Sequence, residues 1–406
     1  MVDQERHQKM KWFDLLYLLC MAAAFLWLLN ALAIGFQANW GKALNQDIPE
    51  FMEGAVNSNF FYDSGLREPF HVFCLKITLL FVAEHEQAAR LTTVIQTFAA
   101  AFALWFFAKE VFGKLVALIS LWLFVINPIV IYYGVSGMRA SVYMALLLAF
   151  AGMLWRILVH NDNNAANVVF TGVFAGALFL TRRYGVVIVA GSILIGLCVL
   201  WRFERQRIGR YLKVSGWIFL IGCLLLLPDL LFRETPAFKD NVNFFRNLEL
   251  YGSIGAFRES PPVSFFHYVF IDHTPAQVVA ILSQNIMRFP HDYLGHFFRN
   301  LPLFWIFAWG ATCLIFVSPR FAWTSLLAWL SLAPIAFVLH LDQVSAGSGV
   351  ENRLVIQTYA LFLPGMVAAL LFFIQVVLRM ILKDSSTEGA PSKKHVLLDT
   401  SFWHHF

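Results

Sequence analysis

QANWGKALNQDIPEFMEGAVNSNFFYDSGLRE, residues 37–68, is the polar stretch around which this chain is organised. It separates a first long apolar run from a sequence that stays mostly apolar as far as residue 379. The stretch carries five carboxylates, namely Asp47, Glu50, Glu53, Asp63 and Glu68. Such a density of carboxylates directly after a membrane-spanning run indicates a functional site on one face of the membrane.

Composition excludes an ordinary soluble domain. Of the 406 residues, 59% are hydrophobic and 14% are charged, whereas charged residues make up about 25% of a soluble domain. The apolar runs have the length that a helix needs to cross the hydrocarbon core of a bilayer. Five scattered cysteines show no paired spacing that would indicate a disulfide framework or a metal knuckle. The sequence therefore predicts an all-α polytopic membrane protein.

We expect about ten transmembrane helices in a single domain that covers residues 1–380, with exterior loops at 37–87 and 232–299. Residues 381–406 are expected to form a cytoplasmic, disordered tail. The predicted spans are 12–36, 88–108, 115–135, 139–158, 166–181, 184–201, 214–231, 300–317, 321–340 and 355–379.

The distribution of basic residues predicts the orientation. With the N-terminus in the cytoplasm, alternating spans leave sixteen Lys and Arg residues inside and fourteen outside. Six of the outer ones fall in the long loop 232–299, which the positive-inside rule does not count. We expect both termini in the cytoplasm of a bacterial inner (plasma) membrane protein. The net charge of +5 then reflects sidedness and gives no reason to expect a nucleic-acid partner.

Two short helices are expected in the first exterior loop. Pro49 favours a helix over residues 49–56. Residues 69–81 are apolar but too short to span, and Pro69 suits a first helical turn. We interpret the second segment as a helix along the outer interface, with His71 and Lys76 on its polar side.

Guanidinium groups recur on the predicted outer face. A single arginine at the end of a span is often only an interfacial anchor. Several together suit the oxygens of a lipid phosphate or diphosphate, and of an adjacent Arg–Arg pair only one need face the site. The last predicted outer loop brings Glu351, together with Arg353, to the start of the last span. The five arginines are Arg67, Arg139, Arg182, Arg183 and Arg353.

Asp47 is the candidate catalytic carboxylate. It could equally cap the short helix that follows it. Held near a cationic phosphate site, it could accept a proton from an attacking hydroxyl. Glu50 and Glu53 share that helix and are either part of the site or solvated surface charge.

Evidence for a metal is weak. His291, Asp292 and His296 could bind one, but this spacing in a loop is a poor signature. No nucleotide-binding or hydrolase motif occurs in a credible context. We assign no cofactor, although a divalent metal stays possible.

Several local patterns resemble the GT-C superfamily of integral-membrane glycosyltransferases, in particular its branch of protein O-mannosyltransferases and aminoarabinose transferases. The resemblance covers the N-terminal 200 residues and one late span. It rests on order and sidedness more than on any strict motif. The patterns are NQDIPEF (45–51), REPF (67–70), EHEQAARL (84–91), FGKLVALISLWLFVINPIVIYYG (112–134) and ENRLVIQTYALFLPG (351–365).

The resemblance implies a hexosyl or pentosyl transfer from a polyprenyl-phosphate-linked sugar to a glycan or protein acceptor, at the outer face and with inversion. It implies Asp47 as general base, a cleft shaped by Arg67 and Glu68, and Arg353 at the donor phosphate. The chain departs from the family in two places: Asp47 is followed by Ile48, and MRAS carries Arg139 where an acidic residue is common.

Two alternatives remain open from the sequence. A transporter or flippase of lipid-linked sugars would need charges deep inside its spans, and most span centres here are apolar. An O-antigen ligase or polymerase would use a large late exterior loop, a role that residues 232–299 could fill.

Overall fold

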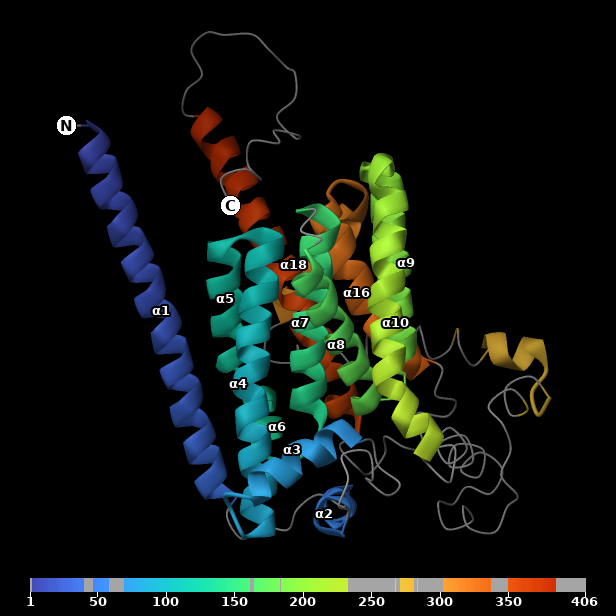
Figure 1. Cartoon of the computed structure of the whole chain (residues 1–406). Helices are drawn as coiled ribbons and strands as arrows, with labels where there is room; N and C mark the ends of the chain where they lie inside the picture. Colours follow the sequence, from blue (N-terminus) through green and yellow to red (C-terminus); the bar gives the residue numbers. More distant parts are fainter. Residues whose placement is uncertain are drawn as a thin grey trace.

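The computed structural model describes residues 2–39, 47–57, 69–160, 164–182, 184–232, 267, 271–280, 283, 302–336 and 350–384. Within these ranges the regular structure is helical throughout (Figure 1). The helices are α1 (Val2–Ala38), α2 (Asp47–Asn57), α3 (Pro69–Leu79), α4 (His85–Phe112), α5 (Lys114–Val125), α6 (Pro128–Gly134), α7 (Ala140–Val159), α8 (Ala165–Thr181), α9 (Gly185–Phe203), α10 (Ile208–Phe232), α15 (Pro302–Cys313), α16 (Pro319–Ala336) and α18 (Val350–Asp384).

The all-α, multi-span architecture predicted from the sequence is confirmed. Among the described residues, six helices are long and apolar enough to cross a membrane, and the bent pair α5–α6 makes a seventh. The three other predicted spans also coincide with helices. Of these, α8 and the segment Phe307–Phe316 are shorter than a full span, and α16 has 18 residues.

The helices alternate in direction, so that two ends of the bundle can be distinguished (Figure 1). α2, α3 and the start of α4 lie at one end, which we call the loop-one end. The start of α1 and the last turns of α18 lie at the other, the basic end. There Lys114 pairs with Asp14 at 2.7 Å and Arg156 with Glu110 at 3.6 Å. The arrangement follows the alternation of spans that the sequence predicts.

The core of the bundle surrounds α7. Seventeen of its 20 residues are buried, because α4, α8 and α18 all contact it. Glycine permits the closest of these approaches: a Cβ added at Gly152 would lie 2.7 Å from the ring of Phe106 on α4. Small residues let membrane helices pack in this way. Helices α1 and α10, by contrast, leave most of their apolar side chains at least partly exposed, as expected of a lipid-facing surface.

The predicted span 115–135 is broken into the pair α5–α6, which bends by 68°. Pro128 opens α6 and the side chain of Asn127 accepts a hydrogen bond from the backbone N–H of Ile129 at 2.9 Å. Proline at a first helical position and asparagine before it favour a helix start. Tyr359 of α18 donates to the carbonyl of Leu123 at 3.1 Å, which satisfies a backbone group close to the break.

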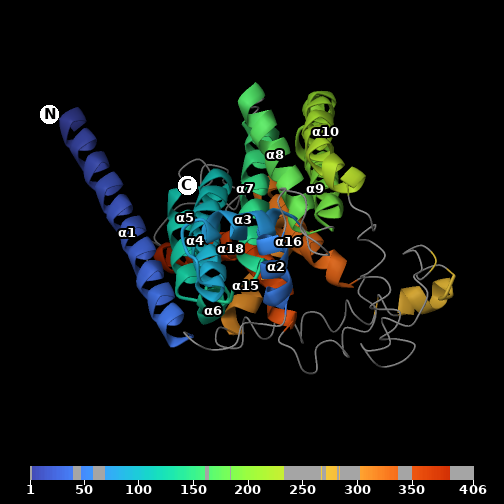
Figure 2. The same cartoon turned by 60° about the horizontal axis from the view of Figure 1, so that its bottom comes forward.

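Helix α3 has 11 residues and lies across the end of the bundle, where it contacts α2, α4 and α8 (Figure 2). It is thus not a span, as the sequence predicts. The prediction that His71 faces the polar side of this helix is wrong, because His71 is fully buried against the protein. Its ring is retained there by hydrogen bonds to α4 and to the turn before α7.

Candidate functional site at the loop-one end

A small apolar core docks helix α2 onto the bundle. The spacing of its apolar residues puts one face of α2 against α3 and against the turn that precedes α7. Anchoring this face fixes the position of the whole helix, including its first residue, Asp47. The members of this core are Ile48, Phe51, Met52, Ala55, Val72, Leu75, Ala89 and Met138.

The turn before α7, residues 135–139, is tightly packed under α2. Gly137 has φ +79°, and a Cβ at this position would lie 2.8 Å from the Cδ1 of Ile48. This conformation is one that glycine adopts without steric penalty. The turn therefore depends on glycine both for its backbone angle and for its contact with α2.

His71 bonds this turn to α3. Its Nε2 lies 3.2 Å from the carbonyl oxygen of Gly137, and its Nδ1 lies 3.2 Å from the Nε2 of Gln96. Since a carbonyl only accepts and an amide nitrogen only donates, the ring proton sits on Nε2. Burial lowers the pKa of His71 to about 4, and the bond to the carbonyl offsets only part of that effect. The ring is thus a neutral donor at physiological pH.

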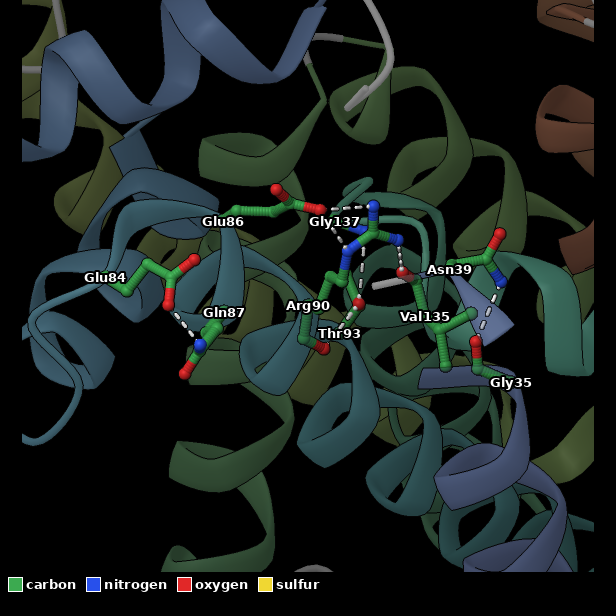
Figure 3. Close-up of polar contacts among 9 residues, drawn as sticks. All are labelled: Gly35, Asn39, Glu84, Glu86, Gln87, Arg90, Thr93, Val135 and Gly137. Carbon is green, nitrogen blue, oxygen red and sulfur yellow. Dashed lines mark hydrogen bonds and ion pairs between the residues drawn. The ribbon is translucent and has the colours of Figure 1, made fainter. Parts of the chain in front are cut away.

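Arg90 of α4 also contacts this turn (Figure 3). One terminal nitrogen donates to the carbonyl of Val135 at 3.0 Å. The Nε and the other terminal nitrogen donate to one carboxylate oxygen of Glu86, at 3.0 and 2.8 Å. A buried guanidinium needs such a partner, because an unpaired charge is costly to remove from water.

Thr93 lies one turn further along α4. Its hydroxyl donates to the carbonyl of Arg90 at 2.9 Å and accepts from the backbone N–H of Gly137 at 3.2 Å (Figure 3). One turn later Thr97 donates to the Oγ of Ser141 at 2.8 Å. The polar side of α4 is thereby bonded to the turn and to the start of α7.

Arg139 ends this turn and is half-buried. Its guanidinium lies 5.6 Å from the centre of the Phe51 ring on α2. The ring of Phe51 also meets His71 edge-on at 5.0 Å. Arg139 is therefore held between α2 and the first turn of α7, within reach of a cation–π contact.

Arg182 lies beside the first turn of α7. It follows the last residue of α8 and is buried, with its guanidinium 5.0 Å from the ring centre of Tyr143 and 5.4 Å from that of Tyr184. It also donates to the Tyr184 hydroxyl. The backbone N–H of Tyr143 in turn bonds the carbonyl of Arg139 at 3.1 Å, so that Tyr143 is one helical turn from Arg139. Two of the predicted arginines thus share one neighbour.

The other predicted site residues are described only in part. Arg67, Glu68 and Arg183 lie outside the described residues, as do His291, Asp292 and His296 of the weak metal motif. Helix positions are described for Asp47 and Glu50 in α2 and for Glu351 and Arg353 in α18, but their side chains are not. Glu53 is exposed on α2. No group of three His, Cys, Asp or Glu side chains able to hold a metal occurs within the described part of the chain.

The role of α4 was not predicted from the sequence, in which EHEQAARL served only as a point of resemblance. Arg90, Thr93 and Thr97 nevertheless recur at the three- and four-residue spacing of one helix face. That spacing could have indicated a polar seam facing the turn before α7. The burial of His71 had no comparable signal, because its partners lie on other elements.

Part of the chain matches a protein family. Residues 67–232, from α3 to α10, match the family model described as dolichyl-phosphate-mannose-protein mannosyltransferase. This segment contains the turn before α7, Arg139 and Arg182. No curated protein sequence matches the chain.

Solved structures from Archaeoglobus fulgidus share the fold. The apo crystal structure of its oligosaccharyltransferase matches over 93% of this chain and 53% of its own, with a TM-score of 0.57 and 14% identity. The oligosaccharyltransferase AglB in complex with an inhibitory peptide and a dolichol-phosphate gives a TM-score of 0.51 at 15% identity, over 93% of this chain and 54% of its own. This chain thus spans about half the length of the structures it resembles.

Proposed function

We propose that this chain is a membrane glycosyltransferase of the GT-C superfamily, an assignment that its partial family match and its fold support. It moves a sugar from a polyprenyl-phosphate donor to a glycan or peptide acceptor at the loop-one face of the membrane. The transfer inverts the anomeric carbon, with Asp47 as general base. Arg139 and Arg182 bind the donor phosphate.

One series of contacts carries the proposal. Phe51 of α2 faces Arg139, and Arg139 is one helical turn from Tyr143, whose ring lies under Arg182. Asp47 precedes Phe51 by one helical turn in α2, and residues four apart share a helix face. A carboxylate-bearing helix end and two guanidinium groups, distant in sequence, are thereby gathered at one end of the bundle.

This arrangement suits the chemistry of glycosyl transfer from a lipid phosphate. As the bond between the anomeric carbon and the phosphate oxygen breaks, negative charge develops on the phosphate. Guanidinium groups already fixed beside it stabilise the transition state more than the ground state. The two tyrosine rings hold Arg182 in place before the donor arrives, so little reorganisation accompanies the reaction.

Asp47 takes the proton of the acceptor hydroxyl as the new glycosidic bond forms. A positioned base of this kind contributes about 10²- to 10⁴-fold in rate. The apolar contacts of Ile48 and Phe51 fix the first turn of α2, and with it the backbone at Asp47. We further propose that Arg67 and Glu68 shape the cleft, and that Glu351 and Arg353 extend it from the start of α18.

The comparisons support the substrate class. The matching family is named for a dolichyl-phosphate-linked sugar, and a structural relative has been solved with a dolichol-phosphate. The bilayer fixes the depth of such a donor, so that the catalytic groups have to lie near the headgroups. The loop-one end, where α3 lies across the ends of the spans, meets this condition.

Asp47→Asn tests the proposal, with Glu53→Gln as a matched control. Both changes remove one negative charge from the same helix, and Glu53 is exposed. With a panel of polyprenyl-phosphate sugars and a membrane extract as the source of acceptor, Asp47→Asn should lower release of polyprenyl phosphate by about 100-fold or more. Glu53→Gln should stay near wild type.

Equal activity of Asp47→Asn and the wild type would refute the catalytic role of Asp47. Transport of the intact donor between leaflets without release of polyprenyl phosphate would instead favour a flippase. Thermal unfolding of both variants shows whether a loss of activity reflects a loss of folded protein.

A further inference from the structure

We infer that Arg90 and Thr93 of α4 are positioning residues, which hold the turn 135–139 so that Arg139 faces the donor phosphate. This inference rests on the proposed function, because it needs Arg139 to bind the phosphate. It adds two residues that contribute through the backbone of another segment without touching the substrate. Neither has a place in the sequence-based site.

Two backbone N–H groups of the turn, those of Val135 and Ser136, bond backbone carbonyls of α6, and other backbone groups bond side chains of α3 and α4. The carbonyl of Val135 accepts from Arg90, and the N–H and the carbonyl of Gly137 bond Thr93 and His71. Buried backbone groups without partners are strongly unfavourable. Three side chains on α3 and α4 therefore set the path of the backbone two to four residues before Arg139.

Arg90 itself is not placed to bind the donor. Its side chain is 6% exposed, and two of its nitrogens are engaged by Glu86. The carboxylate neutralises the guanidinium, while the remaining terminal nitrogen bonds Val135. The charge of Arg90 is thus neutralised by Glu86 within the protein. The forked guanidinium links α4 to the turn (Figure 3).

Thr93 supplies the second constraint. Gly137 has a left-handed backbone angle, and its N–H would be buried without a partner if the Thr93 hydroxyl were removed. The turn can then relax toward other conformations, which displaces Arg139 two residues later. Removal of the Thr93 hydroxyl should therefore weaken donor binding more than it lowers the stability of the whole fold.

Thr92 offers a matched control on the same helix. It is as buried as Thr93, but its hydroxyl donates to the carbonyl of Ala88 at 2.7 Å and lies within hydrogen-bond distance of the Thr78 hydroxyl, at 2.8 Å. Thr92→Val and Thr93→Val remove the same group from adjacent positions. Only the second removes a contact with the turn.

The test measures binding of polyprenyl phosphate to the full chain in lipid nanodiscs. Thr93→Val should weaken binding by roughly three- to tenfold, as expected for one buried hydrogen bond. Thr92→Val and Thr93→Ser, which keeps the hydroxyl, should bind like wild type. In an Arg139→Gln background, Thr93→Val should cause no further loss, because it acts through Arg139.

A second variant covers the case in which Thr93→Val does not fold. Arg90→Lys keeps the charge beside Glu86, but one ammonium cannot reproduce the fork between Glu86 and Val135. It should weaken binding to a similar degree, and again only while Arg139 is present.

The outcomes separate the two proposals. If Arg139→Gln binds polyprenyl phosphate as well as wild type does, the role of Arg139 in the proposed function fails, and this inference fails with it. If Arg139→Gln weakens binding while Thr93→Val and Arg90→Lys match Thr92→Val, only the positioning role is overturned. The positioning role is also overturned if Thr93→Val weakens binding of polyprenyl phosphate equally in the wild-type and the Arg139→Gln backgrounds.

Discussion

The guanidinium of Arg139 lies 5.6 Å from the centre of the Phe51 ring, and this contact joins two segments that are far apart in sequence. Phe51 belongs to the short helix of the first loop, and Arg139 to the turn before the most buried helix. The contact therefore couples the position of Asp47, one turn before Phe51, to that of the arginines. If the proposed function is correct, disturbing this contact separates the base from the phosphate site.

Phe51→Ala should destabilise the protein by about 3 kcal/mol or more, because it removes a large buried side chain. Thermal unfolding in detergent measures the effect. Val56→Ala, an exposed position on the same helix, is the control and should change stability little. Equal effects of the two changes would show that α2 is not anchored through Phe51.

The contributions of the Tyr143 ring and of the Tyr143 hydroxyl to stability can be tested separately. The hydroxyl is buried and makes no hydrogen bond within the described structure, whereas the ring lies under Arg182. Tyr143→Phe should therefore be neutral or slightly stabilising in thermal unfolding. Tyr143→Leu, which removes the ring, should cost about 1 kcal/mol or more through the lost cation–π contact. A Phe variant as unstable as the Leu variant would contradict this assignment.

His71 should make stability depend on pH. Its pKa is about 4 in the folded protein, against about 6.5 when unfolded. Between these values the unfolded chain binds more protons, so stability falls as the pH is lowered from 6.5 to 4. The loss amounts to about 3 kcal/mol by pH 4 and is absent above pH 7. Its contacts Gln96, Gly137 and Phe51 carry no charge that would oppose the effect.

Melting temperatures measured from pH 4.5 to 8 check this prediction. His71→Gln should be less stable than wild type at pH 8, and its stability should fall less on acidification. His85→Gln, at an exposed position, should keep the wild-type pH dependence. The same pH dependence in wild type and His71→Gln would exclude His71 as its source.

Gly137→Ala should destabilise the loop-one end by more than 1 kcal/mol. Alanine is strained at φ +79°, and its Cβ would lie 2.8 Å from Ile48. Gly216→Ala is the control, because Gly216 lies inside α10 with nothing within 4 Å of an added Cβ. Thermal unfolding should show this second change to be neutral or stabilising. A neutral Gly137→Ala would contradict the described turn.

Much of the fold could be predicted from the sequence because apolar length and charge asymmetry act along the chain. The break at Asn127–Pro128 and the short helix after Pro69 likewise follow from local chemistry. By length and hydropathy, six or seven of the ten predicted spans qualify. α8 and the segment Phe307–Phe316 are shorter than the bilayer alone would require, and the 18-residue α16 does not qualify either. Packing against neighbouring helices, which no local pattern reports, decides where such helices end.

The site was harder to predict, because its contacts join residues on different elements. Span counting places Arg139 and Arg182 at the same end of the bundle, but it does not predict the shared neighbour Tyr143 or the ring of Phe51. His71 was expected at the polar surface because histidine is polar, and it is buried because Gln96 and Gly137 satisfy both its nitrogens. Hydrogen-bond partners at such separations are set by tertiary structure.

A structure of the full chain in a lipid nanodisc with bound polyprenyl phosphate would locate the donor phosphate directly. We expect density for the phosphate at the loop-one end, within hydrogen-bond distance of Arg139 or Arg182 and on the same side as Asp47. A phosphate bound at the basic end, or Asp47 turned away from both arginines, would contradict this expectation.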